Sequence, residues 1–576
     1  MRPDPHSYAD TAQPQTRRIS FDLHVDFELH ALSGEIELHF REPGSGSLDL
    51  DTNHLRIAAV FSLDGAALRF ELAKPEPILG TRLRIELPDH ARGVRIRYAT
   101  SPQASALQWL EPAQTLSGQP FLFSQCQPIH ARSVFPLQDS PRVRVTVDSA
   151  RFTVPPRLRT LMAAAFRGRE GPATDVFTMP QPIPPYLLAF AVGDLTSRQL
   201  SHRSAVWAER AVADAAAEEF SGVESMMAAA ERLFGPYEWE RYDILVMPPS
   251  FPFGGMENPR LTFVTPSVIA GDKSLVNVIA HELAHAWTGN LISNATLNDF
   301  WLNEGFTVYA ERRILEALEG VELSELHAAI GRHDLDVALE RFRARPQLTR
   351  LRTDLSGVDP DEAYSTVPYE KGYLFLRRLE ELAGRTAWDG FLRAYMAAFR
   401  FQSIDTRQFL ELLEAELPRL SQRARAMEWI DQAGIPADAP QPKSRRLDEL
   451  QGLAASSSVP TADITPTELL VYLHAVKGGP TESFLRDLDA RFGLSQRKSL
   501  ELRHTFVLLQ LRAGQRAGIE GARRVVSETG RMKYLRPIYQ ELAKRDRAVA
   551  KQVFAEVRET YHPIARAVVE GLLREG

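Results

Sequence analysis

The feature that most constrains the fold is a change in the spacing of apolar residues near position 205. Before it, apolar and polar residues alternate as in half-buried strands; after it, apolar residues recur three and four positions apart, as in helices. We expect Ser33 and Gly34 to turn the chain from its first strand into a second. The alternating runs comprise Ile19, Phe21, Leu23, Val25, Phe27 and Leu29, then 83–87, 94–98, 143–147 and 152–154. They predict a largely antiparallel β domain over residues 1–193.

The remaining chain is expected to be mainly helical. Residues 194–436 form a predicted mixed domain in which only 242–247 and 260–264 have the character of short strands. Residues 437–465 contain several prolines and a run of alanines and serines without sustained periodicity, which is typical of a linker. Residues 466–576 have helical spacing throughout and form the last predicted domain.

Composition excludes several classes of protein. The chain is 44% hydrophobic and 25% charged, which is ordinary for a globular protein. Its length of 576 residues is too great for one compact core. The net charge of −6 provides no basic field for nucleic acid or an anionic membrane. The one cysteine, Cys126, can form no intramolecular disulfide, and the longest apolar runs, such as 186–192, are far shorter than the ~20 residues that cross a bilayer. The N-terminus also lacks the apolar stretch of a secretory signal, so we predict a cytoplasmic protein. From these features together we expect a soluble monomer without nucleic-acid or membrane partners.

A His-Glu-x-x-His pattern at His281, Glu282 and His285 lies within 274–287, a run of good helix formers. Two histidines four positions apart project from one face of a helix and can bind one zinc ion, while Glu282 lies close enough to act on a water at that metal. Glu304, nineteen positions after His285 on the next expected helix, can supply the third ligand. Two histidines and a glutamate leave the fourth zinc position open, as in catalytic sites. We therefore predict one Zn²⁺ per chain and a catalytic role for Glu282.

A second pattern, Gly254-Gly255-Met256-Glu257-Asn258, lies between the two expected strands. Paired glycines let a backbone come close to a ligand, and a carboxylate just beyond them can pair with a substrate ammonium. Alone, the segment would be interpreted as a turn with a solvated glutamate. Its position 23 residues before the zinc motif favours a role in binding.

With these segments the sequence resembles the zinc aminopeptidases of the gluzincin type, within them the leukotriene A(4) hydrolase and aminopeptidase B branch. The resemblance implies a multidomain α+β fold, with an N-terminal antiparallel β saddle, a thermolysin-like mixed α/β catalytic domain and an armadillo-like α-helical C-terminal domain. Because the chain after Gly434 has no alternating run, we expect no β-sandwich before the helical domain. The segments that carry the resemblance are 124–132, 254–258, 281–285, 301–305, 363–372 and 530–533.

The resemblance also implies the reaction, which is release of the N-terminal residue from short peptides. Tyr369 matches a tyrosine that stabilises the oxyanion of the tetrahedral intermediate, and Tyr364 matches a neighbour that lines the pocket. Glu257 and Gln127 match the residues that hold the α-amine and the first residue of the substrate, so a free N-terminus is expected to be required. For Tyr369, a packed aromatic on a helix is the competing interpretation.

Three further charged residues match positions that set substrate preference in this family. Arg531 and Lys533 match residues that bind the terminal carboxylate of the substrate, which favours tripeptides. In an extended or bent segment after Gly530 both side chains can face one side, and a solvated basic surface is the alternative. Asp361 matches an acidic pocket residue associated with basic N-terminal residues, so arginyl substrates are expected.

Two residues depart from the family pattern, and three other functions compete with the aminopeptidase. Pro128 stands where a small residue is expected, and Phe306 where histidine is common.

Leukotriene A(4) hydrolases also open a lipid epoxide, using the positions that Arg531 and Asp361 match, so this activity is an alternative. A catalytically silent peptide-binding scaffold is disfavoured by the complete set of metal and catalytic residues, and an endopeptidase by the amine-binding loop.

Overall fold

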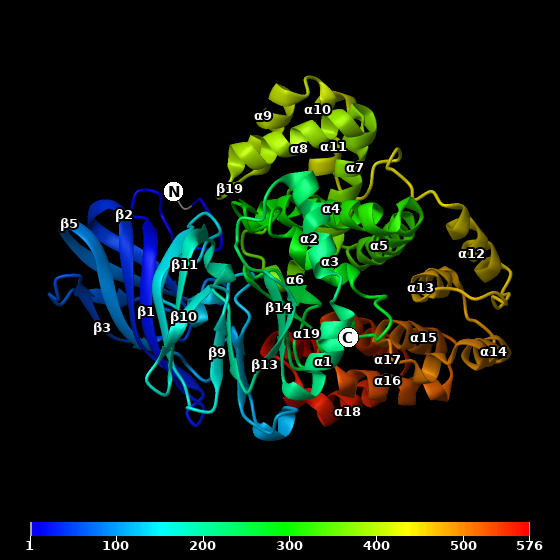
Figure 1. The fold of residues 1–576 in the computed structure, drawn as a ribbon, viewed down its shortest axis with the longest axis horizontal. Helices are drawn as coiled ribbons and strands as arrows, with labels where there is room; N and C mark the ends of the chain where they lie inside the picture. Colours follow the sequence, from blue (N-terminus) through cyan, green and yellow to red (C-terminus); the bar gives the residue numbers. More distant parts are fainter. Residues whose placement is uncertain (1–2, 575–576) are drawn as a thin grey trace.

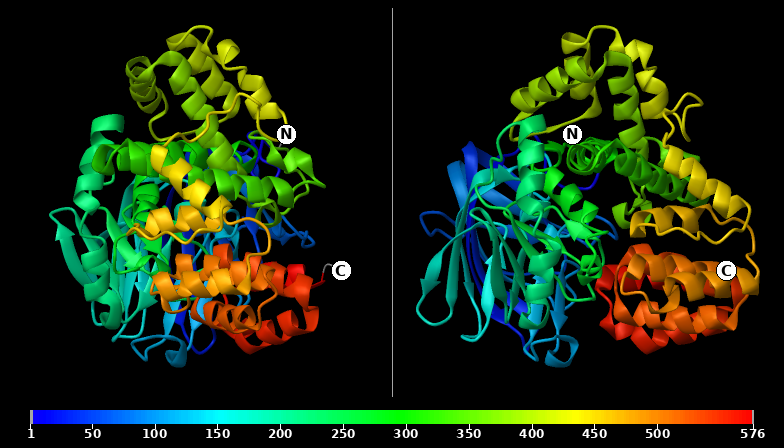
Figure 2. Two further views of the ribbon diagram at one scale, coloured as in Figure 1. Left: turned by 90° about the vertical axis from the view of Figure 1, so that its right-hand side faces the viewer. Right: turned by 45° about the vertical axis from the view of Figure 1, so that its right-hand side comes forward.

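The computed structural model describes residues 3–574 and has three regions along the chain (Figure 1). The N-terminal strands lie on one side, the middle region occupies the centre and top, and the last helices form a layer below it. Figure 2 shows the last helices as a compact group beside the middle region in two further views. The predicted α+β class, with a β-rich start and a helical end, is confirmed. The domain boundaries at 193, 436 and 465 stay predictions.

The N-terminal region is built on an eight-stranded and a four-stranded sheet. The larger sheet has the order β10-β11-β8-β1-β2-β5-β3, with β4 paired to β5, and only the β1–β8 pair is parallel. Its strands are β1 (Thr16–Asp26), β2 (Ala31–Thr52), β3 (Arg56–Ser62), β4 (Phe70–Leu72), β5 (Thr81–Ala99), β8 (Val145–Thr153), β10 (Ala165–Glu170) and β11 (Thr174–Ile183). The smaller sheet has the order β6-β7-β12-β9, with β6 (Leu107–Leu110), β7 (Phe121–Ser124), β9 (Arg159–Met162) and β12 (Phe190–Gly193).

The first turn differs from the sequence prediction. Strand β1 ends at Asp26 and the turn occupies residues 27–30, so Ser33 and Gly34 lie inside β2 and the turn predicted at them was wrong. His30 closes this turn with a left-handed φ of 48°. The run 83–87 joins the run 94–98 in β5, because β-bulges between β2 and β5 let pairing continue past polar residues. Most of the runs 143–147 and 152–154 likewise lies in one strand, β8, whose pairing with β1 and β11 continues through register shifts.

The middle region contains a five-stranded sheet with the order β13-β14-β15-β17-β16. The two predicted strands are confirmed as β15 (Asp243–Val246) and β17 (Leu261–Val264), whereas β13 (Thr196–Ser201), β14 (Ser204–Ala208) and β16 (Gly255–Met256) were not predicted. Strand β16 is the sheet edge and pairs antiparallel with β17. A two-stranded sheet joins β18 (Ile292–Asn294) to β19 (Gln402–Ile404), and no strand follows β19 within residues 3–574, as expected for a chain without a β-sandwich.

Several helices of the middle region pack against the buried helix α4, whose first fifteen residues, 301–315, are all buried. Helix α3 packs beside it and is shorter than the predicted 274–287. The helices are α1 (Arg210–Glu219), α2 (Val223–Phe234), α3 (Asn277–Ala284), α4 (Trp301–Glu319), α5 (Val321–Arg341), α6 (Pro360–Ala363), α7 (Gly372–Ala383), α8 (Arg385–Phe399), α9 (Thr406–Glu416), α10 (Leu420–Arg423) and α11 (Ala426–Asp431).

The predicted linker contains a helix that its sequence pattern did not indicate. Helix α12 (Arg445–Ala455) begins at Ser444, whose hydroxyl accepts a hydrogen bond from the amide of Leu447, and it packs on α13. The helix was not predicted because prolines and serines on both sides interrupt the periodicity of this short amphipathic stretch. The remaining helices are α13 (Pro466–Ala475), α14 (Glu482–Phe492), α15 (Leu500–Arg512), α16 (Arg516–Glu528), α17 (Met532–Arg545), α18 (Arg547–Val557) and α19 (Pro563–Arg574).

Backbone hydrogen bonds join the C-terminal helices to the middle region. The amide of Gly530 donates to the carbonyl of Pro249 (2.7 Å), and the amide of Met532 donates to that of Pro252 (2.8 Å). A Cβ at Gly530 would lie 2.6 Å from the carbonyl oxygen of Ser250, so only glycine allows this approach. The start of α17 is therefore fixed beside the Gly254–Gly255 segment.

The core is shared between the first two regions. One continuous apolar cluster extends from Ile19 to Ala439, while separate clusters fill the C-terminal helices. Within residues 3–574, no helix combines the length and the apolar character that a membrane crossing requires.

The segment 124–132 is anchored inside the protein by Arg132, which is 1% exposed. Its guanidinium donates to the Asp139 carboxylate (2.9 Å) and to the carbonyl oxygens of His6 (2.6 Å) and Leu79 (3.0 Å). The same segment carries Gln127, so this anchor positions a predicted substrate residue.

Replacement of Arg132 by leucine should lower the free energy of unfolding by about 3–5 kcal/mol, because it leaves the buried Asp139 carboxylate without its cation. Thermal and chemical denaturation at neutral pH measure the effect. Arg18→Leu, which breaks an exposed pair with Asp148, is the matched control and should change stability little. Equal, small effects of both variants would contradict the anchoring role.

Candidate metal centre and peptide site

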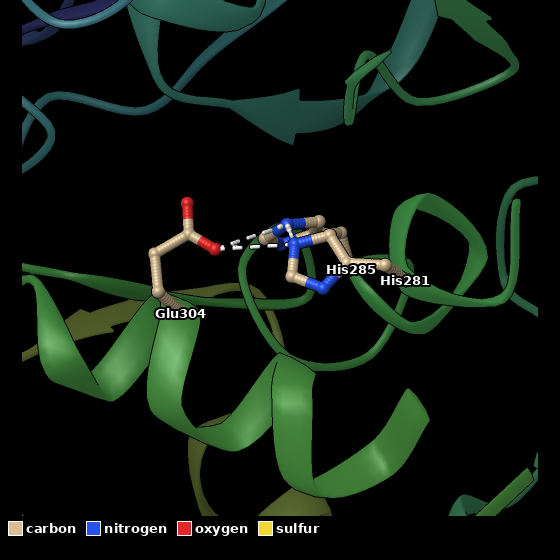
Figure 3. Close-up of side chains that lie close together, drawn as sticks. All are labelled: His281, His285 and Glu304. Atoms are coloured by element: carbon tan, nitrogen blue, oxygen red, sulfur yellow. Dashed lines mark hydrogen bonds and ion pairs between the residues drawn. The ribbon is translucent and has the colours of Figure 1, made fainter. Parts of the chain in front are cut away.

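The three predicted metal ligands converge at one point (Figure 3). His281 lies on α3 and His285 directly follows it, while Glu304 projects toward both imidazoles from α4. The two Nε2 atoms are 3.3 Å apart, and Glu304 Oε2 lies 3.4 Å from that of His281 and 3.5 Å from that of His285. The structure therefore brings the three residues together as the spacing predicted.

This triangle fits a zinc ion. Tetrahedral zinc with bonds of about 2.0–2.1 Å requires ligand atoms about 3.3–3.4 Å apart, which matches the three separations. Glu304 Oε2 is buried and accepts no hydrogen bond, so a cation would satisfy an atom that is otherwise unpartnered. Two imidazoles and a carboxylate are also donors that zinc prefers.

Outer hydrogen bonds orient both imidazoles. His281 Nδ1 lies 3.1 Å from Glu311 Oε2, and the amide of Asn277 donates to the other oxygen of Glu311 (3.2 Å). His285 Nδ1 lies 3.1 Å from the hydroxyl of Thr307. Glu311 was missed in the sequence, although its position seven residues after Glu304 places it on the same face of α4.

Buried carboxylates concentrate negative charge here. Glu257 is 3% exposed and Glu282 is 6% exposed, and their carboxylate oxygens and a nitrogen of His285 all lie within 4.8 Å of one another. Burial raises the pKa of Glu282 to about 8, with Glu304 adding to the effect, and burial together with Glu304 and Glu282 raises that of Glu257. A divalent cation between these acids would supply the missing positive charge, which is a second reason why the donor set fits a metal.

The paired glycines allow two close approaches. A Cβ at Gly255 would lie 2.3 Å from Glu282 Oε1, and a Cβ at Gly254 would lie 2.5 Å from Arg531 Nη2. The segment thus passes between Glu282 on α3 and Arg531 at the start of α17, so any larger side chain would displace one of them.

The neighbours of this segment hold Glu257 in place. The amide of Gln127 donates to Glu257 Oε1 (3.0 Å), and that of Asn290 donates to the Glu257 backbone carbonyl (2.6 Å). Asn290 was not predicted. Met256 and Asn258 are buried, and Asn258 makes no side-chain hydrogen bond.

Two tyrosines from 364–369 face the metal ligands. The hydroxyls of Tyr364 and Tyr369 lie 3.0 Å apart, and the Tyr369 ring stacks on His281 with 6.0 Å between centroids. Tyr369 belongs to a single π-helical turn, Val367–Lys371. Burial raises the pKa of Tyr364 to about 12 and raises that of Tyr369, so both hydroxyls are neutral donors at physiological pH.

Within residues 3–574, Lys533 is paired with carboxylates, whereas Arg531 is not. Lys533 Nζ is 2.9 Å from Glu501 Oε1 and 4.0 Å from Asp334 Oδ2. Arg531 is 8% exposed, donates to the hydroxyl of Tyr534 (3.1 Å), and forms no ion pair within the described residues. Arg531 is thus the cation that remains available to an anionic ligand.

Asp361 lies farther out, at an apolar pocket that Gln127 and Tyr364 also line. It is paired with His130, whose Nε2 lies 2.9 Å from Asp361 Oδ2. The pocket is lined by Gln127, Pro128, Phe253, Leu297, Phe300, Leu348, Arg350, Leu351, Thr353, Leu355, Pro360, Asp361, Ala363, Tyr364, Ser365 and Pro368.

The two departures from the family pattern have different surroundings. Pro128 contributes to the pocket wall after a cis peptide bond from Gln127. Phe306 is 1% exposed and stacks on Tyr395 at 4.8 Å between ring centroids, so it packs in the core.

Comparisons with known proteins agree over nearly the whole chain. The peptidase family M1 domain matches residues 219–429, and the C-terminal region of leukotriene A4 hydrolase matches residues 464–573. A leukotriene A-4 hydrolase of Xenopus laevis is 37% identical over 98% of each chain, and a leucine aminopeptidase 2 of Aspergillus niger is 35% identical over 98% of this chain and 97% of that one. The structure of yeast leukotriene A4 hydrolase in complex with bestatin aligns with a TM-score of 0.92 and 32% identity, covering 100% of this chain and 98% of that one.

These relatives confirm the family resemblance and the hydrolase class, and the M1 family implies zinc. The identities, together with the metal triangle between α3 and α4, show that this metallo-aminopeptidase belongs to the M1 peptidase family, in its leukotriene A4 hydrolase branch.

Proposed function

We propose that the protein removes the N-terminal residue of short peptides, with the amine end bound at Glu257 and the carboxylate end at Arg531. One observation carries the proposal, which is that the carboxylate oxygens of Glu257 and Glu282 lie within 4.8 Å of each other. In a peptide, the α-nitrogen is about 2.5 Å from the carbonyl carbon of the same residue. An ammonium held by Glu257 therefore brings the first peptide bond, and no later one, beside Glu282.

Each group has a defined task in this scheme. A zinc ion bound by His281, His285 and Glu304 would supply a Lewis acid that polarises the scissile carbonyl and acidifies the attacking water. The Glu282 carboxylate takes one proton from that water as the oxygen attacks the carbonyl carbon, and then gives it to the leaving nitrogen as the C–N bond breaks.

Other side chains hold the substrate and the developing charge. The neutral hydroxyl of Tyr369 donates to the carbonyl oxygen as it becomes negative, and its 3.0 Å contact with Tyr364 fixes its direction. Gln127 shares the ammonium site with Glu257. Gly254, Gly255 and Met256 belong to or adjoin the sheet edge β16, where an extended peptide can lie alongside the strand.

Glu282→Gln should lower kcat by about 10²–10⁴-fold and leave the zinc content near that of the unaltered protein, because it removes the proton acceptor but no metal ligand. Steady-state kinetics and metal analysis of the purified variant provide the two readouts. Glu482→Gln, at an exposed position of α14, is the matched control. Near-normal turnover by Glu282→Gln would exclude this role.

Blocking either end of a tripeptide should have separate effects. N-acetylation should reduce kcat/KM by about 10²–10³-fold, because Glu257 is then buried without a cation. C-terminal amidation should raise KM by roughly tenfold, and this difference should disappear in Arg531→Ala but persist in Arg524→Ala, at an exposed position of α16. An N-acetylated tripeptide cleaved as fast as the free one would contradict the amine site.

Epoxide hydrolysis of the leukotriene A4 type is a second candidate, which the apolar pocket beside Asp361 favours. Its phenylalanine and leucine side chains suit a lipid chain, while Arg531 could bind the lipid carboxylate.

Incubation with leukotriene A4 followed by product analysis should then yield an enzymatic dihydroxy acid above the level given by heat-denatured protein. Asp361→Asn should lose this product while still cleaving alanyl substrates. Only the products of spontaneous hydrolysis would limit the protein to peptides.

A further inference from the structure

We propose that His130 sets the substrate charge preference of the pocket by switching the charge that Asp361 presents. The proposal rests on the peptidase function proposed above and on the pocket role of Asp361 that the family resemblance implies. Two contacts carry it: His130 Nε2 lies 2.9 Å from Asp361 Oδ2, and His130 Nδ1 lies 2.8 Å from the hydroxyl of Ser105. The pair joins the 124–132 segment of the N-terminal region to α6 of the middle region.

The pair is shielded from water but reaches the substrate pocket. The side chain of His130 is 14% exposed and that of Asp361 is 24% exposed. Asp361 lines the apolar pocket together with Gln127, which contacts Glu257. A charge at Asp361 is therefore felt by the side chain of a residue whose amine is held at Glu257, and low solvent exposure keeps that interaction strong.

The surroundings let the imidazole gain or lose a proton without losing a hydrogen bond. When His130 is neutral, Nε2–H donates to Asp361 and Nδ1 accepts from the Ser105 hydroxyl. When it is charged, Nε2–H still donates to Asp361, and Nδ1–H donates to the same Ser105 oxygen. A hydroxyl serves both states because it is donor and acceptor, so the charge can change while the ring stays in place.

The carboxylates around the pair favour the charged form of His130. Burial opposes a charge on His130, but the Asp361 carboxylate outweighs it and raises the pKa of His130, with Asp359 before α6 and Asp139 after the anchored segment adding to the effect. His562, before α19, faces His130, and burial lowers its pKa to about 3, so it stays neutral. Arg536 on α17 faces Asp361 and remains a cation, because arginine keeps its proton at all relevant pH values.

The direction of the pH effect follows. Below the pKa of His130 the pair is an imidazolium with a carboxylate and has no net charge, so the pocket has little preference for a cationic side chain. Above that pKa the imidazole is neutral, so the pair carries one more negative charge than below it while the charge of Arg536 is unchanged, and arginyl substrates gain over alanyl ones. Because the pKa is raised, the change should be centred above the ordinary histidine value of about 6.5.

The test is the ratio of kcat/KM for arginyl and alanyl reporter substrates between pH 6 and pH 9. The ratio cancels protonation steps that both substrates share, such as those of the catalytic acids. In the unaltered enzyme the ratio should rise by roughly five- to tenfold with pH. In His130→Gln, whose amide can still donate to Asp361 but cannot titrate, the ratio should be high and independent of pH.

His39→Gln is the matched control, because it removes a histidine 3.4 Å from a carboxylate, Glu37, on the remote strand β2. It should retain the rise. A flat ratio in the unaltered enzyme overturns the inference without need of any variant, and so does an unchanged rise in His130→Gln.

Asp361→Asn separates this inference from the function on which it rests. If this variant keeps the full arginyl preference at every pH, the proposed pocket role of Asp361 is wrong. If Asp361→Asn lowers the preference but His130→Gln behaves like the unaltered enzyme, the pocket role stands and the switch by His130 is wrong.

Discussion

The site depends on the burial of more negative than positive charge around one point. Glu257, Glu282, Glu304 and Glu311 are all at most 8% exposed, and the basic groups among them are His281 on α3 and His285 directly after it. Such a cluster is costly unless a cation occupies it, because buried carboxylates without a partner lose their hydration. The same imbalance that favours a metal also supports the two roles proposed here, which are a substrate ammonium bound at Glu257 and a proton accepted by Glu282.

The surrounding fold brings distant segments to this charge cluster. The sheet edge β16 lies between α3 and the start of α17 because Gly254 and Gly255 have no side chains to prevent it. The first and middle regions share one continuous core, so the segment that carries Gln127 and His130 packs into the same apolar cluster as α3 and α4. The proposed substrate residues thus come from three regions, whereas the predicted metal ligands lie on α4 and on or directly after α3.

The sequence could predict residues whose relative positions are set within one helix, but few of those that are brought together by packing between separate elements. The convergence of His281 and His285 was predictable because local helical spacing determines how they project, and Glu304 was predicted from its position on the next expected helix. Glu311 obeys the same rule and could have been found. The pairing of His130 with Asp361, 231 positions apart, depends on packing between two regions, and that of Lys533 with Glu501 depends on packing between α17 and α15; periodicity reports neither. The first turn was misplaced because alternation continued through Phe27 and Leu29, although Leu29 is 67% exposed.

The two backbone hydrogen bonds from Gly530 and Met532 to the loop 249–252 have a consequence for substrate length. They fix the start of α17, and with it Arg531, relative to the loop that leads into Glu257. If Glu257 and Arg531 bind the two ends of a peptide as proposed, the distance between them selects the length of the peptide. The main-chain hydrogen bonds fix that distance. Side-chain substitutions can change which peptide residues fit between Glu257 and Arg531. A longer peptide can bind at both positions only if the hydrogen bonds between the start of α17 and the loop 249–252 break.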